Sequence, residues 1–394
     1  MSRELALTPA QRHAFQKDLP AWFEKHRRDL PWRRRRTPYR VWVSELMLQQ
    51  TRVDQVIPYY QRFLKRFPDV RALAKAPRDD VLKLWEGLGY YSRAVRAQAT
   101  ARCLVEQHGG RFPRTLAGLQ ALPGIGPYTA AAVGSLALGL DAAVVDGNVV
   151  RVLARVFACA DDPSKPATRQ RWQAWADALL PAGRAGVFNE SMMELGATVC
   201  TPRQPSCALC PLREVCVARR EGRMESYPAR TKKAKVPHKH VGAALVVNGR
   251  GELLIAQRHE ASMLGGLWEF PGGKQEPHET MPACIARELH EELGIEVAVG
   301  DFFVTVRHAF SHFTMDLHVH WARIRKGRPR ALDCADCRWV KPGQLADYAF
   351  GRADQKVMEE LAARDWPGLA RPDAPGKSRR AGSSRAATRA DKSG

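Results

Sequence analysis

The chain has 394 residues and a formal net charge of +21, with nine cysteines. Its length predicts two domains, because a single hydrophobic core seldom grows so large. The positive charge favours a polyanionic partner such as nucleic acid. The longest apolar run, 130–140, is too short to span a bilayer, and residues 1–10 lack the apolar core of a secretory signal. We therefore expect a cytoplasmic chain without a membrane partner, whose cysteines bind metal rather than form disulfides.

Apolar residues recur at helical spacing from about residue 9 to residue 199. The stretch 30–36 is a basic loop that carries one tryptophan, and its arginines either face solvent or contact DNA. Helices are predicted at 9–27, 38–51, 79–84, 148–157 and 168–180.

Glu45 lies among apolar residues in the segment Trp-Val-Ser-Glu-Leu-Met-Leu-Gln-Gln-Thr at 42–51. Removal of a carboxyl group from water raises its pKa, which suits a general acid near neutral pH. The alternative is an exposed helix glutamate, which is the commoner situation for an isolated Glu.

The run Leu-Pro-Gly-Ile-Gly-Pro-Tyr-Thr-Ala at 122–130 predicts a tight turn between two helices. Gly124 and Gly126 permit positive φ and leave backbone N–H groups uncovered where the second helix begins. Such a place binds anions, and a DNA phosphate suits it, although it can also be an ordinary glycine-rich turn. Asp146 follows the apolar helix, where it is either a functional anion or the N-cap of the next helix.

This hairpin with its downstream aspartate resembles the helix-hairpin-helix DNA glycosylases of the endonuclease III superfamily. The run Ser-Glu-x-Met-Leu-Gln-Gln-Thr at 44–51 narrows the resemblance to the adenine DNA glycosylases. It implies an all-α glycosylase domain over residues 1–218, in which Glu45 protonates the adenine. Asp146, beside Asn148, would then stabilise the oxocarbenium-like transition state or orient water.

The same resemblance assigns further residues. Tyr128 stands where strand-cleaving relatives carry a Schiff-base lysine, which implies a monofunctional enzyme because a phenol cannot form a Schiff base. Gln50 and Tyr90 fall where the family inserts side chains into the base stack, although either is equally compatible with ordinary packing. The residues expected around the flipped adenine are Arg28, Trp32, Arg33 and Glu190.

Four cysteines follow with the spacing Cys200-x6-Cys207-x2-Cys210-x5-Cys216. Four thiolates at this spacing can hold a [4Fe–4S] cluster or a zinc ion. Their position after the glycosylase core implies, by the resemblance, that the loop 200–216 holds the iron–sulfur cluster of the superfamily.

The second half of the chain has a different pattern. Residues 219–238 are basic and turn-prone, which predicts a linker. The stretch 239–366 predicts an α+β domain, and residues 367–394 predict a disordered basic tail. Strands are predicted at 241–247, 252–257, 301–310 and 312–324, and helices at 281–293 and 352–363.

The segment from Gly273 to Ile295 matches the Nudix box at every fixed position, so the predicted domain is Nudix-like. Its helix carries Glu288, Glu291 and Glu292 on one face, where a Mg²⁺ ion would relieve their repulsion. The intact box leaves open a magnesium-dependent nucleotide pyrophosphohydrolase carried on a DNA-binding module.

In adenine DNA glycosylases the C-terminal domain usually has a decayed Nudix box and recognises 8-oxoguanine opposite the adenine. Phe310, Ser311 and His312 stand where the family carries its Phe-Ser-His recognition loop, so lesion recognition is the expected role. The expected partner is double-stranded DNA that holds adenine opposite 8-oxoguanine or guanine, and a glycosylase for a different base is the alternative. We expect a monomer associated with the nucleoid.

Overall fold

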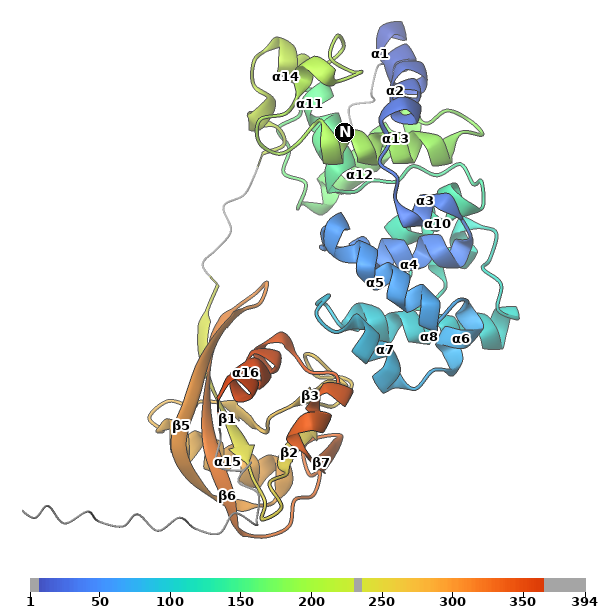
Figure 1. Ribbon diagram of the computed structural model, residues 1–394. Coiled ribbons are helices and arrows are strands. Elements are labelled where there is room, and N and C mark those ends of the chain that lie inside the picture. The colour runs from blue at the N-terminus through green and yellow to red at the C-terminus, as the bar shows by residue number, and fades with distance from the viewer. Residues whose placement is uncertain (1–6, 230–235, 365–394) are drawn as a thin grey trace, which may run out of the picture.

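The computed structural model describes residues 7–229 and 236–364. A helical part is followed by a part that contains two sheets, and the two lie beside each other (Figure 1). The predicted order of an all-α glycosylase domain and an α+β Nudix-like domain is confirmed. Within the described ranges, no helix is both long and apolar enough to cross a membrane.

The helical part is built from short helices that each bury one face. Several of them begin with proline, whose missing N–H is unpaired in a first helical turn anyway. The helices are α1 (Pro9–His13), a π-helical turn (Ala14–Asp18), α2 (Leu19–His26), α3 (Pro31–Arg34), α4 (Pro38–Leu48), α5 (Val53–Arg66), α6 (Val70–Lys75), α7 (Arg78–Trp85), α8 (Ser92–His108), α9 (Leu116–Gln120), α10 (Pro127–Ala137), α11 (Gly147–Val156), α12 (Pro166–Leu179), α13 (Ala185–Thr198) and α14 (Val217–Arg220).

The helical part contains two main hydrophobic cores. The first is formed by α3 to α10 around Trp42, Phe63 and Trp85. The second joins the π-helical turn and α2 to α11–α14 around Phe15 and Trp172. The chain therefore forms two helical lobes, and a site at their boundary is lined by side chains from both lobes.

The helical part extends further than predicted. Ala218 and Tyr227 are buried in the second core, so the chain has not left the helical part at residue 219. The predicted linker 219–238 therefore begins inside the helical part. The rest of that linker at 230–235 and the predicted tail 367–394 lie outside the described residues.

The Nudix-like part contains a four-stranded sheet in the order β4-β1-β6-β5 and a three-stranded sheet in the order β3-β2-β7. β1 and β6 pair in parallel, whereas the other neighbours are antiparallel. The elements are β1 (His238–Val246), β2 (Leu253–Gln257), β3 (Trp268–Glu269), β4 (Gly272–Lys274), α15 (Met281–Leu293), β5 (Glu296–Ala309), β6 (Thr314–Lys326), β7 (Asp336–Val340), a 3-10 turn (Pro342–Asp347) and α16 (Arg352–Ala363).

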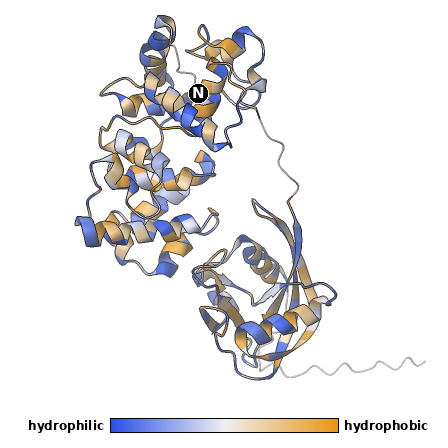
Figure 2. Ribbon diagram, turned by 180° about the vertical axis from the view of Figure 1, so that it is seen from behind, coloured by the Kyte–Doolittle hydropathy of each residue, from blue (hydrophilic) through white to orange (hydrophobic). Residues whose placement is uncertain are grey.

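The two long helices of this part belong to different cores. α15 contributes Ile285 and Leu289 to one, and α16 contributes Val357 and Leu361 to the other. Hydrophobic and hydrophilic residues alternate along these elements as expected for helices and strands that bury one side (Figure 2).

The Nudix-like part also packs directly against α7. Leu267 and Ala349 join the first hydrophobic core of the helical part. Beside them, Lys83 donates a hydrogen bond from Nζ to the carbonyl oxygen of Tyr348 (2.9 Å). The backbone N–H of Phe350 donates to Oε1 of Glu86 (2.8 Å). We call these four residues, Lys83, Glu86, Tyr348 and Phe350, the α7 contact.

Candidate active site

Glu45 lies on α4 and is almost completely buried, as the apolar sequence around it predicted. Tyr128, from the first turn of α10, donates a hydrogen bond from its hydroxyl to Oε2 of Glu45 (2.7 Å). Burial raises the pKa of Glu45 to about 7, with Asp146 and Glu190 adding to the rise and the Tyr128 hydrogen bond opposing it. A carboxyl group with this pKa can hold a proton at neutral pH and release it to a bound base.

Asp146 occupies the N-cap position of α11. Its Oδ1 accepts a hydrogen bond from the backbone N–H of Val149 (2.7 Å), and its Oδ2 accepts one from Nδ2 of Asn148 (2.7 Å). The capping interpretation is therefore correct, yet Asp146 still lines the same pocket as Glu45. Burial raises the pKa of Asp146, while these two hydrogen bonds favour the charged form.

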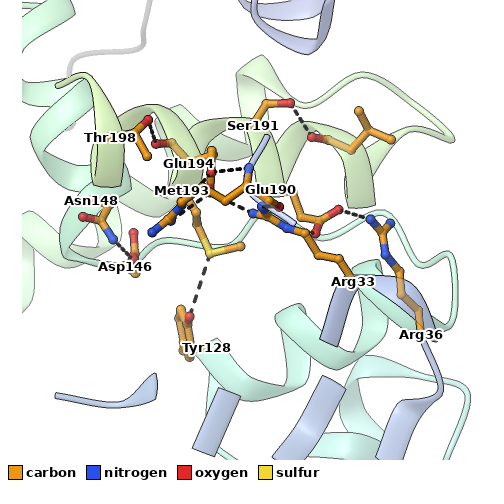
Figure 3. Close-up of polar contacts among 12 residues, drawn as sticks. Arg33, Arg36, Tyr128, Asp146, Asn148, Glu190, Ser191, Met193, Glu194 and Thr198 are labelled. Atoms are coloured by element: carbon orange, nitrogen blue, oxygen red, sulfur yellow. Dashed lines mark hydrogen bonds and ion pairs between the residues drawn. The ribbon is translucent and has the colours of Figure 1, made fainter. Parts of the chain in front are cut away.

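Glu190 and the neighbouring Glu194, on α13, are held by arginines from the segment before α4 (Figure 3). Arg33 donates from Nε to Oε1 of Glu190 (3.1 Å) and from Nη2 to Oε2 of Glu194 (2.9 Å). Arg36 pairs with Oε2 of Glu190 (2.7 Å), and Arg28 forms a two-point contact with Glu194. These arginines thus fix the carboxylates of α13 at the lobe boundary.

This arrangement corrects the prediction for the stretch 30–36. The stretch contains the one-turn helix α3 rather than only loop, and Trp32 is buried against Tyr60. Arg33 is only 11% exposed. It therefore belongs neither to a solvated charge run nor to an open DNA-contact surface, because its guanidinium is used by Glu190 and Glu194.

A cavity of about 190 Å³ connects these groups. Its walls come from α4, α10, the start of α11 and α13, so both lobes contribute. All predicted catalytic and adenine-contacting residues line it, namely Arg28, Trp32, Arg33, Glu45, Tyr128, Asp146, Asn148 and Glu190. The volume is below the roughly 300–1,000 Å³ of pockets for drug-sized ligands, which suits a single flat base.

Arg151 is a further residue of the site that was not predicted from the sequence. Its Nη2 donates to Oδ1 of Asn148 (2.7 Å), and its Nε donates to the carbonyl oxygen of Cys200 (2.7 Å). The residue therefore connects the pocket to the cysteine loop. Its position one helical turn after Asn148 is the signal that could have indicated this contact.

Gln50 and Tyr90, the predicted wedge residues, are both exposed and have positive φ values of 57° and 49°. Left-handed backbone is uncommon for residues other than glycine, and such strain concentrates at functional sites. The Tyr90 ring is 44% exposed, which is unusual for a large aromatic residue. Both side chains thus stand at the tips of turns, where packing inside the protein does not hold them.

The buried residue Arg93 joins these two turns, and the sequence reasoning did not single it out. Its guanidinium lies between the segment that ends α4 and the Gly87–Tyr91 segment. Burial lowers its pKa to about 10, so it remains charged at neutral pH. Its acceptors are the carbonyl oxygens of Leu46, Met47, Gln49 and Gly89 and the hydroxyl of Thr51.

The hairpin between α9 and α10 has the predicted form. Gly124 has a φ of +77°, and Gly126 is the N-cap of α10. Both glycines are exposed, and a Cβ at Gly126 would meet no atom within 4 Å. The backbone N–H groups at the start of α10 are thus open to an anion from outside.

The predicted recognition loop lies opposite Tyr90. Phe310 is anchored by stacking on Phe313 (ring centroids 4.6 Å apart), whereas Ser311 and His312 are exposed. These three residues of the loop and Tyr90 line one cavity of about 740 Å³ between the helical and Nudix-like parts. The structure therefore brings Tyr90, one of the two predicted wedge residues, to the predicted recognition residues, the nearest of which is 220 positions away in the sequence.

Two family models and several known proteins are similar to this chain. A family model described as HhH-GPD superfamily base excision DNA repair protein matches residues 43–177, and one described as NUDIX domain matches 242–360. The adenine DNA glycosylase of Homo sapiens is 36% identical over 88% of this chain and 73% of its own. This chain belongs to the adenine DNA glycosylase family. The adenine DNA glycosylase of Buchnera aphidicola subsp. Acyrthosiphon pisum is 33% identical over 77% of this chain and 84% of its own. A solved thermostable thymine-DNA glycosylase is 32% identical with a TM-score of 0.49, covering 53% and 97% of the respective chains.

As a member of this family, the chain is an adenine DNA glycosylase of base-excision repair. The family assignment fits the pocket, because it places a protonatable carboxyl group and a second carboxylate around one base-sized space. The family assignment also identifies the excised base as adenine, whereas the sequence motifs alone left open a glycosylase for a different base.

The four cysteines of this adenine DNA glycosylase line one small cavity after α13. Four cysteine sulfurs that share one space are the donor set of a metal centre, either an iron–sulfur cluster or a zinc ion. Arg155, fully buried, donates a hydrogen bond to Sγ of Cys200 (3.2 Å).

The Nudix-box glutamates are on one helix but do not converge on one point. Glu288 and Glu291 contact Arg287 at 3.0 and 3.2 Å, and the Glu291 side chain is 56% exposed. Glu292 is directed to the interior, where burial and the nearby Glu269 raise its pKa to about 8. The predicted magnesium ligands are thus held apart, with an arginine beside two of them.

Proposed function

We propose that this enzyme excises adenine opposite 8-oxoguanine or guanine in duplex DNA, as a monomer on the chromosome, and leaves an intact abasic strand. The observation that carries the chemistry is the buried Glu45, whose carboxyl group lies 2.7 Å from the Tyr128 hydroxyl and titrates near neutral pH. The other carboxylate of the pocket, Asp146, is held by two hydrogen bonds that favour its charged form.

In the proposed reaction, protonated Glu45 donates its proton to the adenine as the glycosidic bond breaks. The bond's electron pair leaves with the base, and positive charge develops on the sugar. Asp146 stabilises this charge, and a water molecule then adds to the sugar and passes a proton to the Glu45 carboxylate, which restores the acid. The products are free adenine and an abasic site, and no covalent enzyme intermediate is required.

Glu190 is proposed to recognise the adenine. Its carboxylate accepts a hydrogen bond from Arg33 and forms an ion pair with Arg36, and these two contacts orient it at the pocket wall. A carboxylate has lone pairs to spare after two such contacts, so it can also accept from the amino group of adenine. Guanine presents a carbonyl oxygen in that position and would be repelled.

The absence of strand cleavage follows from the same pocket. Tyr128 stands where strand-cleaving relatives carry the Schiff-base lysine, and none of the described residues that line the pocket is a lysine. The wild-type enzyme should therefore yield no adduct with DNA after borohydride reduction. A strong trapped adduct would contradict the monofunctional proposal.

Recognition of the opposite base is proposed for the loop at 310–312. Ser311 and His312 are exposed donors and acceptors in the cavity that they share with Tyr90. A base opposite the extruded adenine would lie at the wedge, so these residues can contact it while Tyr90 fills the gap in the stack. This position supports reading of the lesion rather than hydrolysis of a free nucleotide.

A [4Fe–4S] cluster is proposed for Cys200, Cys207, Cys210 and Cys216, because all four line one cavity directly after α13 of the glycosylase part. Bound there, the cluster would rigidly crosslink the loop that carries Arg203 and Arg213. The purified protein should then be yellow-brown because of thiolate-to-iron charge transfer. Colourless, stable protein that contains one zinc ion per cysteine loop would contradict this assignment.

The deciding experiment is a single-turnover excision assay on duplexes with adenine opposite 8-oxoguanine, guanine, cytosine or thymine. The first two should be cleaved fastest after alkali, and the double variant Ser311→Ala, His312→Ala should lose roughly tenfold or more of the preference for 8-oxoguanine over guanine. This loss corresponds to one or two hydrogen bonds. Equal preference in the wild type and the variant would overturn the role of the loop, and preference for another excised base would overturn the reaction.

A further inference from the structure

The four-stranded sheet carries a cluster of histidines at the beginning of β1, outside the three cavities described above. The exposed residues His238 and His240 on β1 alternate with half-buried neighbours and share one face of the sheet. Asp316 on the adjacent β6 is paired in register with His240, and His318 follows it on the same face. Next on this face of β1 is Gly242, which is covered by Met281 and Ile285 of α15. The histidine cluster therefore lies just beyond the start of that helix.

The polar atoms of the cluster are close to one another. Nε2 of His238 lies 3.5 Å from Oδ2 of Asp316, and Nδ1 of His240 lies 3.1 Å from Nε2 of His318. Ligand atoms of His238, His240 and Asp316 all lie within 4.8 Å of one another, and no other trio in the described ranges does so. Nitrogen and oxygen ligands of a tetrahedral zinc ion, bound at 2.0–2.2 Å, stand about 3.4 Å apart.

The neighbouring side chains orient these rings. Thr314 lies with its hydroxyl 2.9 Å from Nδ1 of His238, and Thr305 lies with its hydroxyl 3.0 Å from Nδ1 of His318. In both rings, Nε2 is consequently left to face the cluster. Metal-bound histidines characteristically have their second ring nitrogen fixed by such an outer partner, which sets the tautomer and the ring orientation.

Asp316 supplies the negative charge of the cluster. Arg307 donates from Nε and Nη2 to its two oxygens. The Arg307 side chain is 79% exposed, and a cation at the cluster would compete with it for the Asp316 carboxylate.

We propose that His238, His240, Asp316 and His318 form a binding site for a zinc ion or a similar divalent transition metal. The set of three imidazoles and one carboxylate is typical for such ions and unlike the oxygen sets of magnesium or calcium. The ion would join the first residues of β1 to β6. Since β1 is where the chain enters the Nudix-like part, the ion would fix the entry point of that part. The site is independent of the glycosylase reaction.

Zinc titration of the full-length protein tests this site. Isothermal calorimetry should show one zinc ion that is lost in Asp316→Asn and in His240→Ala. Thr305→Val, which removes only an outer partner, should weaken binding by roughly 10–100-fold. His290→Ala, an exposed histidine on α15, is the matched control and should bind as the wild type does. Cobalt(II) should give the intense visible bands of a tetrahedral site in the wild type and lose them in Asp316→Asn.

The cysteine loop does not confuse the result, because Cys200 and its partners are intact in every variant. Metal bound by those cysteines would therefore persist in Asp316→Asn. His240 is exposed, so His240→Ala keeps the test valid if Asp316→Asn folds poorly. Absence of zinc binding by the wild type, or equal binding by the wild type, Asp316→Asn and His240→Ala, would overturn the proposal.

Discussion

At the scale of single residues, ionisation of Glu45, the proposed catalytic acid, is unfavourable for folding. The folded-state pKa of about 7 lies above the ordinary value of 4.5, so the native protein retains a proton that the unfolded chain releases between these pH values. This contribution to stability is complete below about pH 4.5 and is lost as the pH rises to 7. The loss amounts to about 3 kcal/mol above pH 7, as an upper bound.

Glu45→Gln should therefore abolish adenine release and raise the thermal stability at pH 8. The amide keeps the shape of the side chain but neither donates a catalytic proton nor carries a buried charge. We expect a rise in melting temperature of about 2–4 °C for each kcal/mol recovered, with duplex binding retained. Single-turnover rates, calorimetry and a gel-shift assay measure the three effects. Retention of more than a few per cent of the wild-type rate would contradict the role as acid.

Tyr128→Phe should move the alkaline limb of the pH–rate profile to higher pH. The Tyr128 hydroxyl donates to Glu45 and so favours the carboxylate, which lowers its pKa. Loss of this hydrogen bond leaves the acid protonated over a wider range, by about one pH unit for a bond worth about 1–1.5 kcal/mol. Single-turnover excision from pH 6 to 9 gives the profile. A limb that stays in place or moves to lower pH would disprove this effect of Tyr128.

The residues of the pocket differ in how well the sequence predicts them. Glu45 and Asp146 are recognisable because their immediate neighbours carry the information, one in an apolar segment and the other before a helix. The arginine contacts were not predictable in this way, since Arg33 and Glu190 are 157 positions apart. Basic residues in a row indicate a charged surface, and only the tertiary fold shows that their partners are buried carboxylates.

At the scale of elements, long segments with strong periodicity were predicted well. The helices at 281–293 and 352–363 have the bounds of α15 and α16. The strands β3, β4 and β7 were missed, because two to five residues are too few to show an alternating pattern and pairing with distant strands stabilises them. The end of the helical part was misplaced for a related reason, since the burial of Tyr227 depends on its distant partners.

Arg93 provides a test of how two turns act as one element. Arg93→Lys should weaken base extrusion at least tenfold, because an ammonium group cannot reach the acceptors of both turns at once. The turns that carry Gln50 and Tyr90 would then no longer be held at fixed positions relative to each other. Fluorescence of 2-aminopurine in place of the target adenine measures extrusion directly. Arg102→Lys on the exposed side of the same helix is the control. Extrusion equal to that of the wild type would show that the turns hold their positions without Arg93.

At the scale of the whole molecule, the proposed selectivity for the base opposite adenine would depend on how the Nudix-like part is placed. The loop that carries Ser311 and His312 and the turn that carries Tyr90 form opposite walls of one cavity. These walls belong to different parts of the chain, so their separation is set by the interface between them. The α7 contact is one polar element of that interface, beside the Arg78–Glu260 ion pair and the Gln257–Asp79 hydrogen bond, and Leu267 and Ala349 supply apolar packing.

Lys83→Met combined with Glu86→Gln should therefore reduce the preference for 8-oxoguanine over guanine while leaving excision opposite guanine nearly unchanged. Both substitutions weaken contacts to the Nudix-like part, and neither residue lines the catalytic pocket. A misplaced recognition loop that loses about 1.4 kcal/mol of interaction would lower the preference about tenfold. Asp80 lies on α7, as Lys83 does, and forms an exposed ion pair with Arg66 of α5. Asp80→Asn breaks this pair, is the control and should keep the preference. If the double variant loses both activities equally, α7 serves the stability of the helical part instead of aligning the two parts.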